Sequence, residues 1–520
     1  MLNSRKTGRA TRRLLLQRLA LLTALALVAL AACDDDGTGQ EDIVVLGQAF
    51  TSGVASADVT STSALLWTRA EGASVVTVDV SADQSFEDEV RTLEAQTSAE
   101  RDFTAQVRVD GLTPDTPYYY RFRHGDQRSF TGTFVTAPAD DVSKPIRFVF
   151  SGDSDGSRNP DGTPVYNEFE VLGDALAEDP AFFLYFGDTI YADRDPVATT
   201  LDAYRAKYRQ NREYLRLSSI LQRTAIYTIW DDHEVENDFA GATVDPALLE
   251  AGRQAFREYM PIDDTGDPPR MYRSFRYGKD LELIILDQRS YRDASAADAC
   301  LFDGNPDPVP GVAAPGVPEG VRNLRSFVGL PLDAAPGCLE AIDDPARTML
   351  GDAQKQYFLD RLAASDATWK VVVNEVPVQM LLALPYDRWE GYAAERREVL
   401  RFIRDNGIKN VVFLTTDFHA NIFGPVRVDN FTEPDVVAYE AVAGPIATAQ
   451  LARDIEDTIG KGGGGALSGL LEGVVGVDCA VLDAYAYGLV EVDPASGAFT
   501  ITAKDQTGRE LCKTELEAQS

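Results

Sequence analysis

Histidine, cysteine and basic residues are scarce in this chain. Its 520 residues include only three histidines and five cysteines, and 49 basic residues stand against 82 acidic ones, for a formal net charge of −33. A surface so poor in basic side chains argues against nucleic-acid binding, because that binding depends on lysine and arginine meeting phosphates. The cysteines do not have the spacing of metal ligands, and the sequence contains no internal repeat. The acidic excess is typical of a soluble exterior and says nothing about catalysis.

Acidic residues are absent from the first 32 positions, which we interpret as an export signal. A basic front precedes an apolar run that begins at Leu19 and is too short to span a membrane, since spanning takes ~20 residues. The run ends in Leu-Ala-Ala-Cys (30–33), which looks like a bacterial lipoprotein cleavage box. Cys33 would then be lipidated and would anchor the protein in the cell membrane, facing the periplasm or the exterior. Residues 33–47 form an acidic tether.

Two neighbouring arginines in the basic front, Arg12 and Arg13, resemble a twin-arginine export signal. An ordinary basic front that happens to contain such a pair is the alternative.

Four cysteines remain after Cys33, and an even number in an exported protein suggests two disulfides with three possible connectivities. We favour the two local pairs, since each brackets one segment of the chain: Cys300–Cys338 and Cys479–Cys512.

Two domains are expected after the tether. Residues 48–140 contain several short segments with a period of two, which predict an N-terminal β-sandwich, and the run 111–120 resembles fibronectin type III modules. In residues 145–515, strands alternate with helical patterns, as in a layered α/β domain. A Pro-rich stretch at 294–345 has no periodicity. The expected core strands are 146–150, 182–186, 225–230, 281–286, 370–373 and 411–414, and the expected helices include 201–211, 351–364 and 395–406.

Polar side chains follow three of these strands at the points where the strands end. The segments are 183–193, 229–238 and 411–421, and each passes from an apolar run to carboxylates, a tyrosine, an asparagine or a histidine. Two of the three histidines, His233 and His419, lie in them. Ligands of α/β folds bind at the carboxyl ends of strands, and oxygen donors with some imidazole suit hard or borderline cations. The sequence therefore predicts a metal site.

The pattern fits a binuclear hydrolase. Two cations about 3.5–4 Å apart need a shared carboxylate and a bridging water made into hydroxide. Asp188 is the best candidate for the bridge, because Gly187 permits a tight exit from the strand. Asp153 or Asp155 would bind the first cation after strand 146–150. The other expected ligands are His419 for the first cation, Asp232 and Asp417 for the second, and the amide oxygen of Asn374.

Other polar residues are expected to act without binding metal or to have structural roles. His233 would stabilise charge on the phosphoryl group or the leaving oxygen. Arg289, with Arg292, would bind phosphate through two parallel hydrogen bonds, although arginines after a strand commonly pair with acids. Asp231 is as well explained as a helix cap, and Tyr191 by itself as packing.

The ordered set of motifs resembles the alkaline phosphatase D family (PhoD-like phosphatases), within the calcineurin-like metallophosphoesterases. The resemblance covers most of the mature chain. It rests on Gly-Asp-Thr-Ile-Tyr (187–191), Trp-Asp-Asp-His-Glu-Val-Glu-Asn (230–237), Leu-Asp-Gln-Arg-Ser-Tyr-Arg (286–292) and Leu-Thr-Thr-Asp-Phe-His (414–419). It implies a four-layer sandwich of mixed sheets flanked by helices, beside the small all-β domain. It also implies hydrolysis of phosphoesters at neutral to alkaline pH.

The family resemblance further implies ferric iron and calcium, with Tyr191 as a tyrosinate ligand of the iron. One motif departs from the family, since Ser-Gly-Asp (151–153) stands where the family has Ser-Cys-Gln, so zinc or manganese is possible instead. We expect a monomer that acts on a phosphoester. The alternatives are a phospholipase or phosphodiesterase of lipid or nucleotide diesters, and a non-catalytic surface-binding protein.

Overall fold

The computed structural model describes residues 45–519, except for residue 47 and segments 264–269, 297–298, 300–336, 383–386 and 460. Cys33, Cys300 and most of the Pro-rich stretch therefore lie outside the described residues. Within the described part, the helices are too short or too polar to cross a bilayer.

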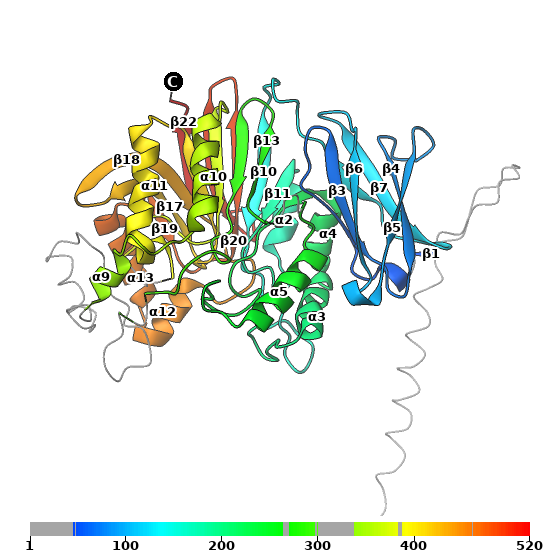
Figure 1. The fold of residues 1–520 in the computed structure, drawn as a ribbon, viewed down its shortest axis with the longest axis horizontal. Helices are drawn as coiled ribbons and strands as arrows, with labels where there is room; N and C mark the ends of the chain where they lie inside the picture. The colour runs from blue at the N-terminus through cyan, green and yellow to red at the C-terminus, as the bar shows by residue number, and fades with distance from the viewer. Residues whose placement is uncertain are drawn as a thin grey trace, which may run out of the picture. The chain divides into compact units, whose positions relative to one another are not determined.

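The N-terminal part is all-β and contributes to two sheets (Figure 1). One is a six-stranded sheet of β1 (Val45–Leu46), β4 (Val75–Ser81), β5 (Arg91–Gln96), β7 (Pro117–His124), β8 (Gln127–Arg128) and β9 (Gly132–Val135). The other strands are β2 (Val54–Ala57), β3 (Ser63–Arg69) and β6 (Thr104–Asp110). Alternate residues of β7, namely Tyr118, Tyr120 and Phe122, are buried, so the period of two in the sequence reports an inward-facing row.

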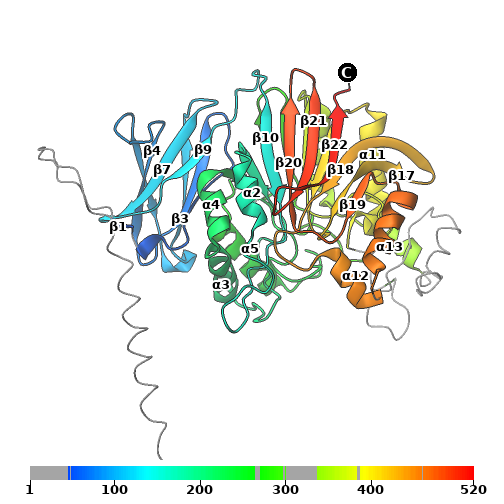
Figure 2. The same ribbon diagram turned by 180° about the vertical axis from the view of Figure 1, so that it is seen from behind.

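A nine-stranded sheet runs from this N-terminal part into the α/β part without a break. Strand β2 pairs in parallel with β12, where Ala57 lies opposite Ile226. The strand order is β22-β21-β20-β10-β11-β12-β2-β3-β6. The strands from the α/β part are β10 (Ile146–Ser151), β11 (Phe182–Tyr185), β12 (Ala225–Tyr227), β20 (Ala486–Asp493), β21 (Ala498–Asp505) and β22 (Glu510–Glu517). Strands β20–β22 form the antiparallel end of this sheet (Figure 2).

A seven-stranded mixed sheet packs against the nine-stranded sheet. Its order is β13 (Arg273–Tyr277), β14 (Leu281–Ile285), β15 (Trp369–Asn374), β16 (Val411–Thr415), β18 (Glu433–Val442), β17 (Asn421–Asp429) and β19 (Cys479–Val481). Leu283 and Ile285 belong to the core shared by the two sheets, whereas Ile284 and Leu286 pack with helices on the opposite face. Those helices are α10 (Gly351–Ala364) and α11 (Ala393–Asp405).

Helices cover the nine-stranded sheet as well, which gives the layer order helix, sheet, sheet, helix. On this side lie α2 (Val171–Ala177), α3 (Leu201–Arg212), α4 (Leu215–Arg223) and α5 (Pro246–Tyr259). The remaining described helices include α9 (Cys338–Ile342), α12 (Leu451–Ile459) and α13 (Gly463–Leu470). The expected α/β architecture with an all-β N-terminal part is therefore confirmed, as are the six core strands and three helices named from the sequence. Strand β12 ends at Tyr227, earlier than expected, and residues 228–230 have no regular secondary structure.

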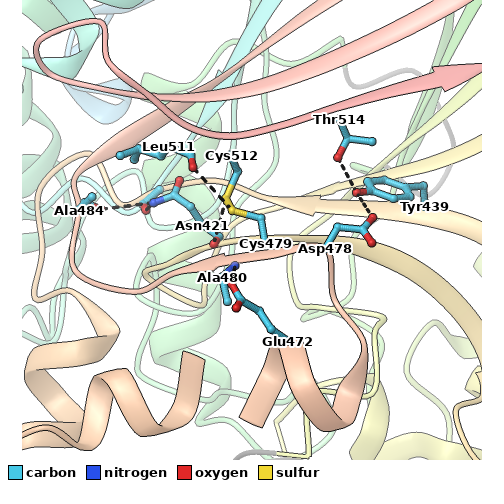
Figure 3. The surroundings of a disulfide bond; sticks show 11 residues. Asn421, Tyr439, Glu472, Asp478, Cys479, Ala480, Ala484, Leu511, Cys512 and Thr514 are labelled. Atoms are coloured by element: carbon cyan, nitrogen blue, oxygen red, sulfur yellow. Dashed lines mark hydrogen bonds between the residues drawn. A yellow bond between two sulfur atoms is a disulfide. The ribbon is translucent and has the colours of Figure 1, made fainter. Parts of the chain in front are cut away.

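A disulfide joins the two sheets at one pair of their edges (Figure 3). Cys479 on β19 and Cys512 on β22 have Cα atoms 5.9 Å apart, and these strands end the seven- and nine-stranded sheets. This is the pair favoured from the sequence. Nearby, the Tyr439 hydroxyl makes hydrogen bonds of 2.8 Å to Asp478 and to Thr514, which adds a polar link between the sheets. Cys338 is also disulfide-bonded, and its expected partner Cys300 lies outside the described residues.

Replacing Cys479 and Cys512 by alanine is expected to lower the free energy of unfolding. The bond closes a loop with a sequence separation of 33 residues, and the loss of such a constraint on the unfolded chain costs about 3–4 kcal/mol. Urea titration of the double variant beside the oxidised wild type measures the difference. An unchanged denaturation midpoint would show that the bond does not stabilise the joined edges.

Candidate metal centre

Four of the predicted metal ligands lie in turns with a left-handed backbone. Asp153, Asp188, Asp417 and His419 have φ angles of 57°, 49°, 63° and 49°. Side chains with a Cβ avoid this region, although aspartate and histidine enter it more often than most residues. Asp153, Asp188 and Asp417 follow β10, β11 and β16 within three residues, so each strand ends in a sharp turn. Strained backbone of this kind persists where the surroundings fix it, and it is often found at functional sites.

Hydrogen bonds tie these turns to one another. The backbone N–H groups of Asp153 and Ser154 donate to the carbonyl oxygens of Gly187 (3.1 Å) and Asp188 (2.8 Å). The N–H of Asp417 donates to Oδ1 of Asp153 at 3.1 Å. The ends of three strands from the two sheets are thereby fixed against each other.

Glycine is required where the first two turns meet. A Cβ on Gly152 would lie 2.1 Å from the carbonyl oxygen of Phe186, and one on Gly187, whose φ is +72°, would lie 2.4 Å from Oγ1 of Thr416. Gly152 occupies the position at which the family motif has cysteine. With this backbone a cysteine does not fit at position 152.

Two groups of possible ligands share one carboxylate. Asp153, Asp188 and His419 each offer a ligand atom within 4.8 Å of the others, and Asp188, Asp232 and His233 form a second such group. Asp188 is the member common to both. This is the arrangement that a bridging carboxylate requires.

The buried carboxylates lie close together, and the positively charged side chains around them do not balance all of their negative charge. Burial raises the pKa of Asp188 well above its usual value, and Asp232, Asp231, Glu234 and Asp153 raise it further. The pKa of Asp153 is raised in the same way by burial and then by Asp417 and Asp231, and its Oδ2 atom is buried without a hydrogen-bond partner among the described residues. An orphaned carboxylate oxygen in a crowd of acids is costly unless a cation binds.

The other donors also fit a cation. Burial, with the charge of His233, lowers the pKa of His419 to about 3, so its imidazole is neutral and able to bind metal. The Tyr191 hydroxyl lies 3.1 Å from Nε2 of His419. Burial and the neighbouring Asp188 and Asp153 raise the pKa of Tyr191 well above its usual value. Tyr191 would therefore lose its proton only to a strongly polarising cation.

His233 is oriented by a carboxylate that the sequence analysis assigned no role. Its Nδ1 atom lies 2.7 Å from Oδ1 of Asp193, and its Nε2 atom lies 3.9 Å from Oδ2 of Asp188. Burial alone would lower the pKa of His233, but Asp232 and the hydrogen bond to Asp193 outweigh burial and raise it to about 9. The ring also packs against that of Tyr191 in a tilted arrangement, with centroids 4.2 Å apart. The only sequence signal for Asp193 was its place two residues after Tyr191.

Arg289 is fully buried and surrounded by acids. It forms ion pairs with Asp231, with Asp387 at 2.8 Å and with Asp417 at 3.4 Å, and its NH2 lies 3.7 Å from Asp232. These contacts correspond to the alternative left open from the sequence, in which the arginine pairs with acids. Asp231 thus pairs with an arginine, and no helix begins beside it. Asp387, which the sequence analysis missed, also pairs with Arg292 at 2.5 Å.

Three predicted ligands, Asp155, Asn374 and Asp417, are not brought into the shared groups. Oδ1 of Asp155 accepts the N–H of Ser157 at 2.8 Å, which closes a local turn. The amide oxygen of Asn374 accepts hydrogen bonds from Gln288 (2.6 Å) and Trp389 (3.0 Å), so both of its lone pairs are used. Asp417 lies beside the groups, linked to Asp153 through its N–H and to Arg289 through its carboxylate.

Comparison with known proteins agrees with this geometry. Residues 161–463 match the PhoD-like phosphatase family, and residues 41–138 match the N-terminal domain of PhoD-like phosphatases. Alkaline phosphatase D of Bacillus subtilis (strain 168) is 29% identical over 423 residues. The match covers 73% of this chain and 66% of the length of that relative, slightly less than two thirds.

Two solved structures share the fold. A structure of PhoD has a TM-score of 0.69 at 24% identity, over 91% of this chain and 92% of that chain. A purple acid phosphatase from yellow lupin (Lupinus luteus) seeds has a TM-score of 0.52 at 11% identity, over 89% of this chain and 74% of the other. The family match spans more than half of the sequence and includes the strand ends that carry Asp188, Asp232 and His419. The chain belongs to the PhoD-like phosphatase family.

Proposed function

We propose that the protein is an exported phosphoester hydrolase with a binuclear or larger metal centre. The observation that carries the proposal is Asp188, which lies within ligand distance of Asp153 and His419 in one group and of Asp232 in the other. Bound cations would supply Lewis acidity and an activated water nucleophile. Membership of the PhoD-like phosphatase family supports a phosphoester as the substrate.

The residues divide into those that hold cations and those that handle protons. Asp153, Asp188 and His419 would hold one cation with Tyr191, and Asp188 with Asp232 would hold the second. Asp417 lies beside this set, because its N–H donates to Oδ1 of Asp153 while its carboxylate pairs with Arg289. Oxygen donors dominate, which favours ferric iron with calcium over a pair of zinc ions, with manganese as the alternative.

His233 is the proton donor in this proposal. Asp193 accepts the Nδ1 proton and stabilises the charged imidazole, so that Nε2 carries a proton on the side of Asp188. From there Nε2 donates to the oxygen of the departing alcohol. Because the group is charged at neutral pH, it also offsets negative charge on the phosphoryl oxygens.

Export is supported by the cysteines. The Cys479–Cys512 bond is of a kind that persists outside the reducing cytoplasm. The leader and the Leu-Ala-Ala-Cys box support lipidation at Cys33 and a place at the membrane facing outward.

Asp188→Asn is expected to remove most of the hydrolysis of p-nitrophenyl phosphate and to reduce bound metal. An amide cannot bridge two cations, and losing several kcal/mol of metal stabilisation corresponds to a fall in kcat of ~10²–10³-fold. Elemental analysis and kinetics on the folded variant measure both effects. Asp435→Asn, at an exposed position on β18, is the control. Full metal content with near-native turnover would contradict the bridging role.

His233→Ala is expected to retain the metals and lose turnover by ~10²–10⁴-fold, the usual contribution of a general acid. Asp193→Asn should lower kcat by less, since it weakens the orientation of the ring and leaves the ring in place. His124→Ala, on β7 of the N-terminal sheet, is the matched control and should be unchanged. A collapse of metal content in the His233 variant would make this residue a ligand.

Iron bound to a tyrosinate absorbs visible light, so the purified protein should be coloured, and Tyr191→Phe should abolish the absorption band. Tyr291→Phe, at a partly exposed tyrosine, should leave it intact. Visible spectra with elemental analysis provide the measurement. A colourless, active protein that contains zinc or manganese and no iron would refute the assignment of the metal.

A further inference from the structure

Arg194 lies at the edge of the metal centre, directly after the residue that orients His233. It is exposed, and its guanidinium carbon lies 5.7 Å from the ring centroid of Tyr191. That ring packs against the ring of His233, and the Tyr191 hydroxyl lies 3.1 Å from Nε2 of His419. Arg194 is therefore a cation beside the tyrosine that contacts both imidazoles.

The backbone around Arg194 is fixed on both sides. The N–H of Ala192 donates to the carbonyl oxygen of His233 at 2.8 Å, and Nζ of Lys207, on α3, donates to the carbonyl oxygen of Arg194 at 2.8 Å. Asp193 uses one carboxylate oxygen for His233 and the other for the N–H of Asn237 at 3.1 Å. The arginine is thus presented from a rigid turn.

The guanidinium of Arg194 differs from those of other arginines near the site. Arg289 and Arg292 are fully buried and bind carboxylates or carbonyl oxygens, and Arg388 lies 3.6 Å from the carboxylate of Asp417. Within the described part of the chain, the Arg194 guanidinium has the ring of Tyr191 as its close contact and makes no hydrogen bond or ion pair. Its donors are available to a ligand.

The charge of Arg194 acts on the centre itself. It lowers the pKa of both His233 and His419, while Asp155, Asp193 and the Asp454 carboxylate on α12 surround it at longer range. A phosphoester carries anionic oxygens, and the acids around the centre repel any that are not bound to a cation. A guanidinium matches such oxygens in charge and in the geometry of its donors.

We propose that Arg194 is a substrate-binding residue whose guanidinium pairs with an anionic oxygen of the phosphoester. The inference rests on the proposed function and adds to it a preference between classes of phosphoester substrate. A monoester dianion carries more charge than a diester monoanion and gains more from this contact. Arg194 would thus favour monoesters.

The test titrates inorganic phosphate into metal-loaded protein by calorimetry, and measures kinetics on p-nitrophenyl phosphate and bis(p-nitrophenyl) phosphate. Arg194→Gln should weaken phosphate binding and raise the monoester KM by about 10-fold or more, as expected for a lost charge-assisted hydrogen bond, with kcat and metal content little changed. The diester KM should rise less. Arg194→Lys should restore part of the binding. Arg158→Gln, which removes a cation 4.4 Å from the ring of Tyr214, is the matched control.

Phosphate affinity that is the same in Arg194→Gln and the wild type would overturn the proposal. A loss of metal from Arg194→Gln would also overturn it, because Arg194 would then act on the metal centre and not on the substrate. A fall in kcat with KM unchanged in this variant would overturn it too. If the wild type hydrolyses neither ester, the proposed function fails, yet the phosphate titration still decides whether Arg194 binds the anion.

Discussion

The repulsion among buried carboxylates around Asp188 is the constraint on which the rest of the site depends. Asp153, Asp188, Asp231 and Asp232 are buried together, and burial with the neighbouring charges raises the pKa of three of them. Arg289 balances Asp231 and lowers the pKa of Asp232 against burial, but it does not reach Asp153 or Asp188. The uncompensated side of the cluster is therefore the side that holds Asp188, His419 and Tyr191, where cations would bind.

The fold holds these charges in place through the ends of its strands. Asp153, Asp188 and Asp417 lie in left-handed turns that follow β10 and β11 of one sheet and β16 of the other. Hydrogen bonds from backbone N–H groups join these turns. The disulfide binds the two sheets at one edge, close to the start of β17, which begins two residues after His419. The large apolar core thus supports a small, strained and highly charged site.

Sequence reasoning recovered the strands and the residues at their ends, because a buried strand followed by a polar turn is a local pattern. It predicted that Asp188 bridges two cations, which stays a prediction, and it favoured the pairing of Cys479 with Cys512, which the structure confirms. It did not reveal which side chains meet across the two sheets. The partners of Arg289, the hydrogen bonds that occupy Asn374 and the contact of Asp193 with His233 join residues 15 to 128 positions apart. Such contacts depend on how the sheets pack, which no local pattern encodes.

The central claim is that one carboxylate is shared by two cations. Anomalous X-ray diffraction from crystals of the metal-loaded protein, collected on either side of the iron edge, tests it most directly. The account predicts at least two metal peaks with the Asp188 carboxylate between them, one beside His419 and Tyr191 and one beside Asp232, with His233 bound to neither. A single peak, or two peaks that Asp188 does not join, would contradict it.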